Sequence, residues 1–100
     1  MHDTNLIAGE SVEILFEAFR RLEVKQGPDG MIACAIELEA ELGQPLLRAV
    51  HRVEQELRSA ELALIESDES ARRRTEDQRL ADAFVELALA VSAAVFNRAA

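Results

Sequence analysis

Few side chains in this chain of 100 residues have the types and spacing needed for chemistry. Metal sites in helical bundles commonly use a Glu-x-x-His pair on each of two facing helices. The sequence has a single pair of this kind, in reversed order, formed by His51 and Glu54 beside an apolar stripe. We therefore interpret His51 as a solvated surface histidine and predict that the chain binds no metal.

The sequence gives equally little support for nucleophilic catalysis or nucleotide binding. Its single cysteine, Cys34, lies in an apolar run with no histidine close to it in the sequence, which favours core packing over catalysis. The glycines at positions 9, 27, 30 and 43 are scattered and form no phosphate-binding loop. We predict that the protein is not an enzyme and uses no cofactor.

The composition is typical of one globular domain, which we expect to span residues 1–100. Apolar residues make up 49% of the chain and all four aromatic residues are Phe, so we expect an aliphatic core. The 19 acidic and 11 basic residues give a net charge of −8. Such a charge repels phosphate backbones and attracts basic surfaces, so nucleic acid is an unlikely partner and a basic protein surface is favoured.

Cysteine usage and apolar patterning predict a cytoplasmic protein. A single cysteine cannot form an internal disulfide, and the first residues do not resemble a secretion signal. The longest apolar stretch, from Leu80 to Phe96, is shorter than the roughly 20 residues that a bilayer span needs. We therefore expect no contact with a membrane.

Apolar residues at helical spacing predict a first helix between Thr4 and Gln26, with Ser11 as the N-cap of its stable part. A tight turn is expected at 27–30, in the sequence Gly-Pro-Asp-Gly. A second helix is expected from Met31 to Leu42, with Gly43 as its C-terminal cap.

A long third helix is expected to begin at Pro45 and to continue through Leu64. The apolar seam fails beyond Leu64, which predicts a break near residues 67–70, although a continuous helix remains an alternative. The fourth helix, around Leu80 to Phe96, has an apolar face wider than one neighbouring helix can cover, so it is either central or shared between two copies.

These elements predict an all-α fold, a compact bundle of about four helices that is dimeric through the C-terminal helix if that face is shared. The predicted core residues are Val12, Leu15, Phe19, Leu22, Leu38, Leu42, Val50, Val53, Leu57, Leu80, Phe84, Leu87 and Val91.

Two acidic faces stand out from the rest of the sequence. One lies on the first predicted helix, opposite its apolar stripe, and the other covers the second predicted helix, which has no Lys or Arg. Such faces are commonly only solvated surface. If they dock on a basic partner, the binding residues are Glu10, Glu13, Ile14, Glu17, Asp29, Glu37 and Glu41, with Ile14 as an apolar anchor.

The segment from Ile36 to Gly43, followed by Leu47 to Val53, resembles the helix-turn-helix of winged-helix and repressor-type regulators. The resemblance covers about a quarter of the chain and implies a recognition helix in the DNA major groove. It assigns DNA contacts to Arg48, Arg52, Gln55 and Ser59.

We interpret the chain as a non-catalytic, acidic helical protein-interaction module that docks on a basic, nucleic-acid-binding surface of a protein partner. In size and charge it is similar to the small inhibitors of phages and mobile elements, anti-CRISPR proteins among them. The alternatives are a helix-turn-helix transcriptional regulator and a self-associating structural helical protein, which would make the chain a homo-oligomer.

Overall fold

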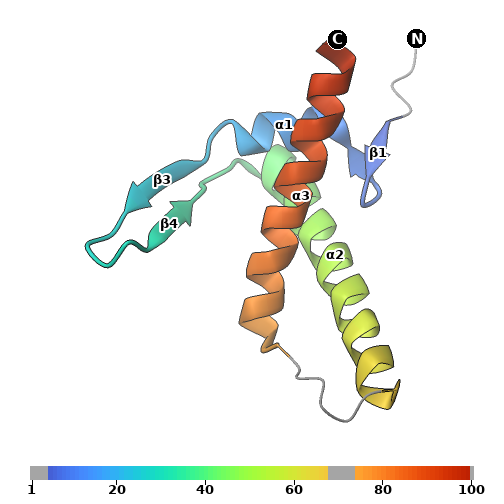
Figure 1. Ribbon diagram of the computed structural model, residues 1–100. Helices are drawn as coiled ribbons and strands as arrows, with labels where there is room; N and C mark the ends of the chain where they lie inside the picture. Colours follow the sequence, from blue (N-terminus) through green and yellow to red (C-terminus); the bar gives the residue numbers. More distant parts are fainter. Residues whose placement is uncertain (1–4, 68–73, 100) are drawn as a thin grey trace.

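The computed structural model describes residues 5–67 and 74–99, which form three helices and two small antiparallel hairpins (Figure 1). The helices are α1 (Val12–Phe19), α2 (Ala40–Ser67) and α3 (Glu76–Ala99), and the strands are β1 (Leu6–Ile7), β2 (Glu10–Ser11), β3 (Glu23–Gln26) and β4 (Ile32–Ala35). The prediction of an all-α bundle of four helices was therefore wrong. Stretches that we had assigned to helices pair instead as strands.

The first hairpin, β1–β2, is closed by a two-residue turn at Ala8 and Gly9. Both residues have positive φ, 51° and 79° respectively. Mirror-image turns of this kind match the twist of a two-residue hairpin, but they suit glycine better than alanine. Ser11 follows as the N-cap residue of α1, as predicted, although its side chain makes no capping hydrogen bond.

The second hairpin, β3–β4, contains the turn that we predicted at residues 27–30. The amide of Gly27 donates a hydrogen bond of 2.7 Å to the carbonyl of Met31, and Gly30 has a φ of 75°. The turn is therefore confirmed, but it joins two strands and not two helices.

The helical assignment failed here because the apolar residues around this turn fit both periodicities. Helix α1 ends at Phe19, and Val24 in β3 lies opposite Cys34 in β4. β-branched residues on both sides of a short, glycine-containing turn are a hairpin signal. That local signal prevails over the four-residue spacing that had suggested a helix from Met31 to Leu42.

Helix α2 runs through Gly43 and Pro45, where we had placed the end of one helix and the start of the next. The amides of Leu42 and Gly43 both donate to the carbonyl of Glu39, over 3.0 and 2.8 Å, and so begin the helix. Proline is best tolerated near a helix start, where few intrahelical bonds are lost. The turn that the helix-turn-helix resemblance requires at Gly43 is consequently not formed.

The predicted break after Leu64 is confirmed, because α2 ends at Ser67 and α3 begins at Glu76. The rest of the predicted cap region, residues 68–70, lies outside the described residues. The start of α3 is a capping box: the amide of Thr75 donates to Gln78 Oε1 (2.9 Å), and the amide of Gln78 donates to Thr75 Oγ1 (3.1 Å). The spacing of Thr75 and Gln78 in the sequence carries this signal.

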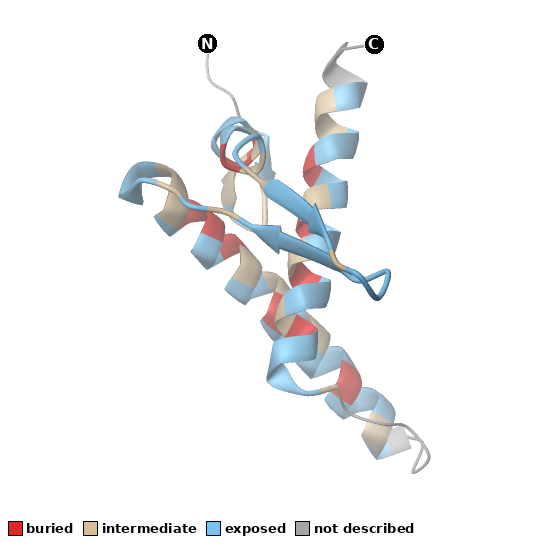
Figure 2. Cartoon of the chain, turned by 90° about the vertical axis from the view of Figure 1, so that its left-hand side faces the viewer, coloured by how far each residue is buried: buried red, intermediate tan, exposed pale blue. Residues whose placement is uncertain are grey.

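The hydrophobic core lies where α1 packs against both long helices (Figure 2). Its buried residues are Leu15, Ala18, Leu46, Ala49, Leu87 and Val91. Of the predicted core residues, Val12, Leu15, Leu87 and Val91 are buried, and Phe19, Leu22, Leu38, Leu42, Val50, Val53, Leu57, Leu80 and Phe84 are half-buried. The rings of Phe19 and Phe84 meet edge to face with their centroids 5.1 Å apart, which joins α1 to α3.

Within the described residues, no helix combines the length and the apolar character that crossing a membrane requires.

Candidate functional site

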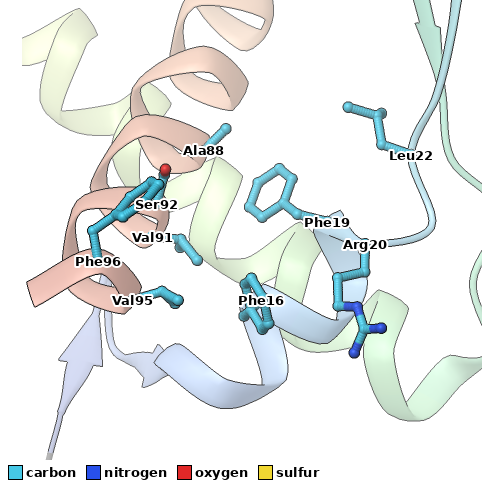
Figure 3. A pocket seen from close by; sticks show the side chains of 9 residues that line it. All are labelled: Phe16, Phe19, Arg20, Leu22, Ala88, Val91, Ser92, Val95 and Phe96. Carbon is cyan, nitrogen blue, oxygen red and sulfur yellow. The ribbon is translucent and has the colours of Figure 1, made fainter. Parts of the chain in front are cut away.

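An apolar groove opens between α1 and the C-terminal half of α3 (Figure 3). Its volume is about 450 Å³, and its lining consists of Phe16, Phe19, Arg20, Leu22, Ala88, Val91, Ser92, Val95 and Phe96. Arg20 is the one charged residue in this lining. Concave apolar surfaces of this size are where proteins bind apolar side chains or small ligands.

Arg20 stands at the edge of the groove and is engaged with its own helix. Its Nη1 donates to Glu17 Oε1 over 3.1 Å, and its guanidinium carbon lies 5.9 Å from the ring centroid of Phe16. In Figure 3 the guanidinium points away from the side chains of α3. The interior of the groove is therefore suited to binding apolar groups.

The apolar surface continues from the groove along the outer side of α3. Val85, Leu89 and Phe96 are 55%, 66% and 73% exposed, and their spacing of four and seven residues places them on one helix face. Phe96 belongs to both the groove and this face. The wide apolar face that we predicted for the C-terminal helix thus remains partly uncovered in the single chain.

The β3–β4 hairpin projects from the body of the molecule (Figure 1), and all eight of its strand residues are exposed. The register places Val24 opposite Cys34 and Gln26 opposite Ile32 on one side of the ribbon. The prediction that Cys34 packs in a core was therefore wrong, since this thiol is exposed. One side of the ribbon is largely apolar and nothing in the described chain covers it.

The single chain exposes more surface than a compact protein of its size. Its accessible surface is 7384 Å², whereas a compact monomer of 11.1 kDa exposes about 5,700 Å². Its radius of gyration is 15.5 Å, compared with about 13 Å for a typical 100-residue domain. The chain therefore exposes roughly 1,700 Å² more than a compact monomer of its mass.

Glu10, which we had assigned to partner binding, forms ion pairs with two arginines of the same chain. Its carboxylate receives two hydrogen bonds from Arg48, of 3.0 and 3.1 Å, and one of 2.6 Å from Arg52. Arg52 also donates to the carbonyl of Ala8 over 2.6 Å. The hydrogen bonds from Arg48 hold the pKa of Glu10 below its ordinary value, although partial burial opposes the shift.

This cluster, which we call the Glu10 clamp, joins the first hairpin to α2. It engages Arg48 and Arg52, the two cations that the helix-turn-helix resemblance assigned to DNA. The other two residues of that assignment, Gln55 and Ser59, are exposed on α2.

The other residues predicted to bind a partner are exposed: Glu13, Ile14, Glu17, Asp29, Glu37 and Glu41. They come from α1, from the tip of the β3–β4 hairpin, from the segment before α2 (Glu37) and from the first turn of α2 (Glu41). The structure therefore does not combine them into one face.

A group of acidic residues lies at the root of the β3–β4 hairpin, where Glu37 and Glu41, which we had assigned to binding, are joined by Glu23 and Glu39. The hairpin-root acids are Glu23, Glu37, Glu39 and Glu41, all of them exposed. Glu23 and Glu37 line a hollow together with Arg21, and Arg21 also lies 3.6 Å from Glu39. Three of these carboxylates, Glu23, Glu37 and Glu39, thus lie near Arg21. Glu41 follows in the first turn of α2, so the root of the hairpin is negatively charged.

A buried ion cluster joins α2 to α3 on the side away from the groove. Arg79 donates to Glu54 over 2.7 Å and lies 3.5 Å from Glu61, and all three side chains are less than a tenth exposed. Arg74 donates to Glu61 over 3.0 Å and also pairs with Asp82. The polar groups that are buried between the two helices therefore have partners.

This cluster shifts the pKa values of its members in the direction that keeps them charged. Hydrogen bonds from Arg79 and Arg74 lower the pKa of Glu54 and of Glu61 respectively, against the opposing effect of desolvation. Sequence reasoning missed the cluster, since Glu54 had been placed on a polar flank. The available signal was that Glu54 and Glu61 are seven residues apart and share one side of a helix.

Among the described residues, no three side chains of His, Cys, Asp or Glu gather in a way that could hold a metal ion. His51 is exposed on α2, as predicted. Compared with known proteins, the chain matches no family model, no curated protein and no solved structure.

Proposed function

We propose that this chain is a non-catalytic protein-interaction module that docks on a basic surface of a protein partner. The observation that carries the proposal is the distribution of its large apolar side chains. Among the described residues, eleven large hydrophobic residues are exposed, whereas only Val12, Leu15, Leu46, Leu87 and Val91 are buried. Monomeric proteins seldom leave extensive apolar surface uncovered, and larger exposed patches mark interaction sites.

The charge of the chain indicates the chemistry of the partner. The net charge of −8 attracts a basic surface and accelerates the encounter with it. The hairpin-root acids concentrate this charge at one end of the β3–β4 hairpin. Glu37 and Glu41, which the sequence already assigned to binding, belong to this group.

Such a module would act as an inhibitor by covering the binding surface of its partner. A basic protein surface that binds nucleic acid would lose access to phosphates once carboxylates cover it. This mode of action is the one suggested by the similarity in size and charge to inhibitors of phages and mobile elements. DNA binding by the chain itself has weaker support, because Arg48 and Arg52 are engaged by Glu10.

Charge reversal in the hairpin-root acids tests this function. The chain is immobilised as wild type and as the double variant Glu37→Lys/Glu41→Lys, and proteins retained from a host lysate are identified at low and high salt. A retained protein is then purified and titrated with each form of the chain. We expect binding by the wild type that weakens with salt, and binding at least tenfold weaker for the variant.

The matched control is Glu56→Lys/Glu66→Lys, which makes the same change in net charge at two exposed positions of α2. It should keep most of the affinity, because only the overall charge is altered. Equal loss in both double variants would mean that net charge alone is recognised. Unchanged affinity of Glu37→Lys/Glu41→Lys would refute the acidic docking surface.

A further inference from the structure

We propose that a second copy of this chain covers the apolar groove, and that the two copies exchange their β3–β4 hairpins. In this arrangement the apolar side of each hairpin packs into the groove of the other copy. This dimer goes beyond the proposed function, because it is formed by the chain alone and needs no other partner.

The hairpin requires cover for its own stability. A two-stranded ribbon by itself is at best marginally stable in water, and three or more strands or a packed face are needed. All eight strand residues of β3 and β4 are exposed, and Val24 and Ile32 are 61% and 63% exposed. Packing the side that carries Val24, Cys34 and Ile32 against an apolar surface would supply the missing support.

The groove offers an apolar surface that two chains of like charge can share. Its lining holds no carboxylate, and its one cation, Arg20, already pairs with Glu17. The groove itself therefore brings no carboxylate into the contact. The lining of the groove therefore adds little electrostatic repulsion between two negatively charged copies.

The position of the groove in the chain favours a reciprocal contact. Leu22 lines the groove and β3 begins at the next residue, Glu23, so the hairpin leaves the body at the edge of the groove. Figure 1 shows it extending away from the helices, so it does not fold back over its own groove. A two-fold axis pairs two such molecules so that each protruding ribbon meets the other groove, and both apolar surfaces are covered at once.

The total exposed area of the chain is compatible with a dimer interface. The surface excess of roughly 1,700 Å² per chain is about twice the ~800 Å² that each partner contributes to a standard interface.

The oligomeric state of the purified chain is the first test. Sedimentation and light scattering should show a dimer that dissociates on dilution. Ile32→Asp in the hairpin and Ser92→Asp in the groove should each weaken the dimer at least about tenfold, because each places a charge in the apolar contact. Leu64→Asp is the matched control, since Leu64 is 58% exposed on α2, outside both surfaces. Circular dichroism checks that each variant is folded.

Disulfide trapping tests the exchange itself and uses Cys34, the only cysteine in the sequence. In the variant Ser92→Cys, mild oxidation should join Cys34 of one copy to the new thiol of the other, giving a covalent dimer on a non-reducing gel. The control variant Ser59→Cys, with an exposed thiol on α2, should not show this increase. Adding Cys34→Ser to Ser92→Cys should remove the product.

The proposal fails if the wild type is monomeric at all accessible concentrations. It also fails if a dimer persists unchanged in Ile32→Asp and Ser92→Asp, or if Ser92→Cys gives no more covalent dimer than Ser59→Cys. These readouts use the purified chain alone, so they stand or fall independently of the acidic docking surface.

Discussion

At the scale of single residues, the tightest constraint is at Gly9. Its φ of 79° already disfavours a side chain, and a Cβ at this position would collide with the guanidinium of Arg52. The position therefore serves two purposes, because it closes the first hairpin and leaves room for an arginine of α2. Gly30 has nearly the same φ of 75°, but nothing lies within 4 Å of where its Cβ would be.

These two glycines make a matched pair for measurement. Gly30→Ala should lower the free energy of unfolding by about 1–2 kcal/mol, the cost of a left-handed conformation for alanine. Gly9→Ala should cost more, because Arg52 must also move. Chemical denaturation of both variants measures the difference, and adding Arg52→Ala should reduce it. Equal costs for the two glycines would show that Arg52 places no demand on this turn.

The residues that the sequence revealed best are the apolar ones of the helices. All thirteen predicted core residues are buried or half-buried, and helical spacing correctly places the eleven that lie in α1, α2 and α3 on the inner faces. Leu22 and Leu38 are half-buried outside the helices. The ionic contacts were not visible, because Glu10 meets Arg52 across 42 positions of sequence. No local pattern marks such a pair, and the charge of Glu10 on an acidic helix face had suggested a role at the surface.

At the scale of elements, the two long helices are held by different forces along their length. Near α1 they share the apolar core, and farther along they are joined by the ion cluster of Glu54, Glu61, Arg74 and Arg79. Arginine stays charged over the whole accessible pH range, so the carboxylates decide the pH response. The contact between α2 and α3 should therefore weaken in acid.

The sign of this effect follows from the pKa values of Glu54 and Glu61, which are lowered from an ordinary 4.5. The folded chain binds fewer protons than the unfolded chain around that pH. The stability that these pairs contribute is complete above pH 4.5 and is lost as the pH falls through the lowered pKa values. Melting temperatures followed by circular dichroism from about pH 7 to pH 3 should show this decline.

Glu54→Gln separates this cluster from general acid unfolding. The variant should melt lower than the wild type at neutral pH and should lose less on acidification, since one of the titrating groups is gone. Glu56→Gln, at an exposed position of the same helix, should follow the wild-type curve. A Glu54→Gln curve that runs parallel to the wild-type curve would contradict this role of the buried pair.

The elements also show where sequence patterns are ambiguous. The helical positions of α1, α2 and α3 could be predicted from periodicity, but β3 and β4 could not, because four-residue strands are too short for periodicity to distinguish them from a helical turn. The signal for these strands was the glycine-containing turn between them. Gly43 and Pro45 led to a different error, because they suggested a helix end and a helix start where α2 is continuous. Both are common at helix ends, yet their place in the first turns of α2 makes them tolerable.

At the scale of the whole molecule, the buried core is small compared with the exposed apolar surface of the described residues. Leu87 is 1% exposed and belongs to the cluster that joins all three helices, whereas Leu89, two residues along the same helix, is 66% exposed. The two leucines have the same helix propensity, so substituting them compares burial alone.

Leu87→Ala should lower the free energy of unfolding by about 2–5 kcal/mol, because it removes buried methyl groups and leaves a cavity. Leu89→Ala should change it by less than about 0.5 kcal/mol, as is usual for exposed positions. Urea unfolding at a fixed protein concentration measures both. Similar losses in the two variants would mean that the outer face of α3 is covered in solution.

The Glu10 clamp has a consequence for how the chain is made. A ribosome adds about 5–20 residues per second, and Arg52 follows Glu10 by 42 positions. Arg52 is therefore synthesised on the order of 2–8 s after Glu10, the residue that it binds. Until α2 has been synthesised, the nascent segment that contains Glu10 lacks its ionic contacts. The folding of the first hairpin therefore depends on residues that are made later.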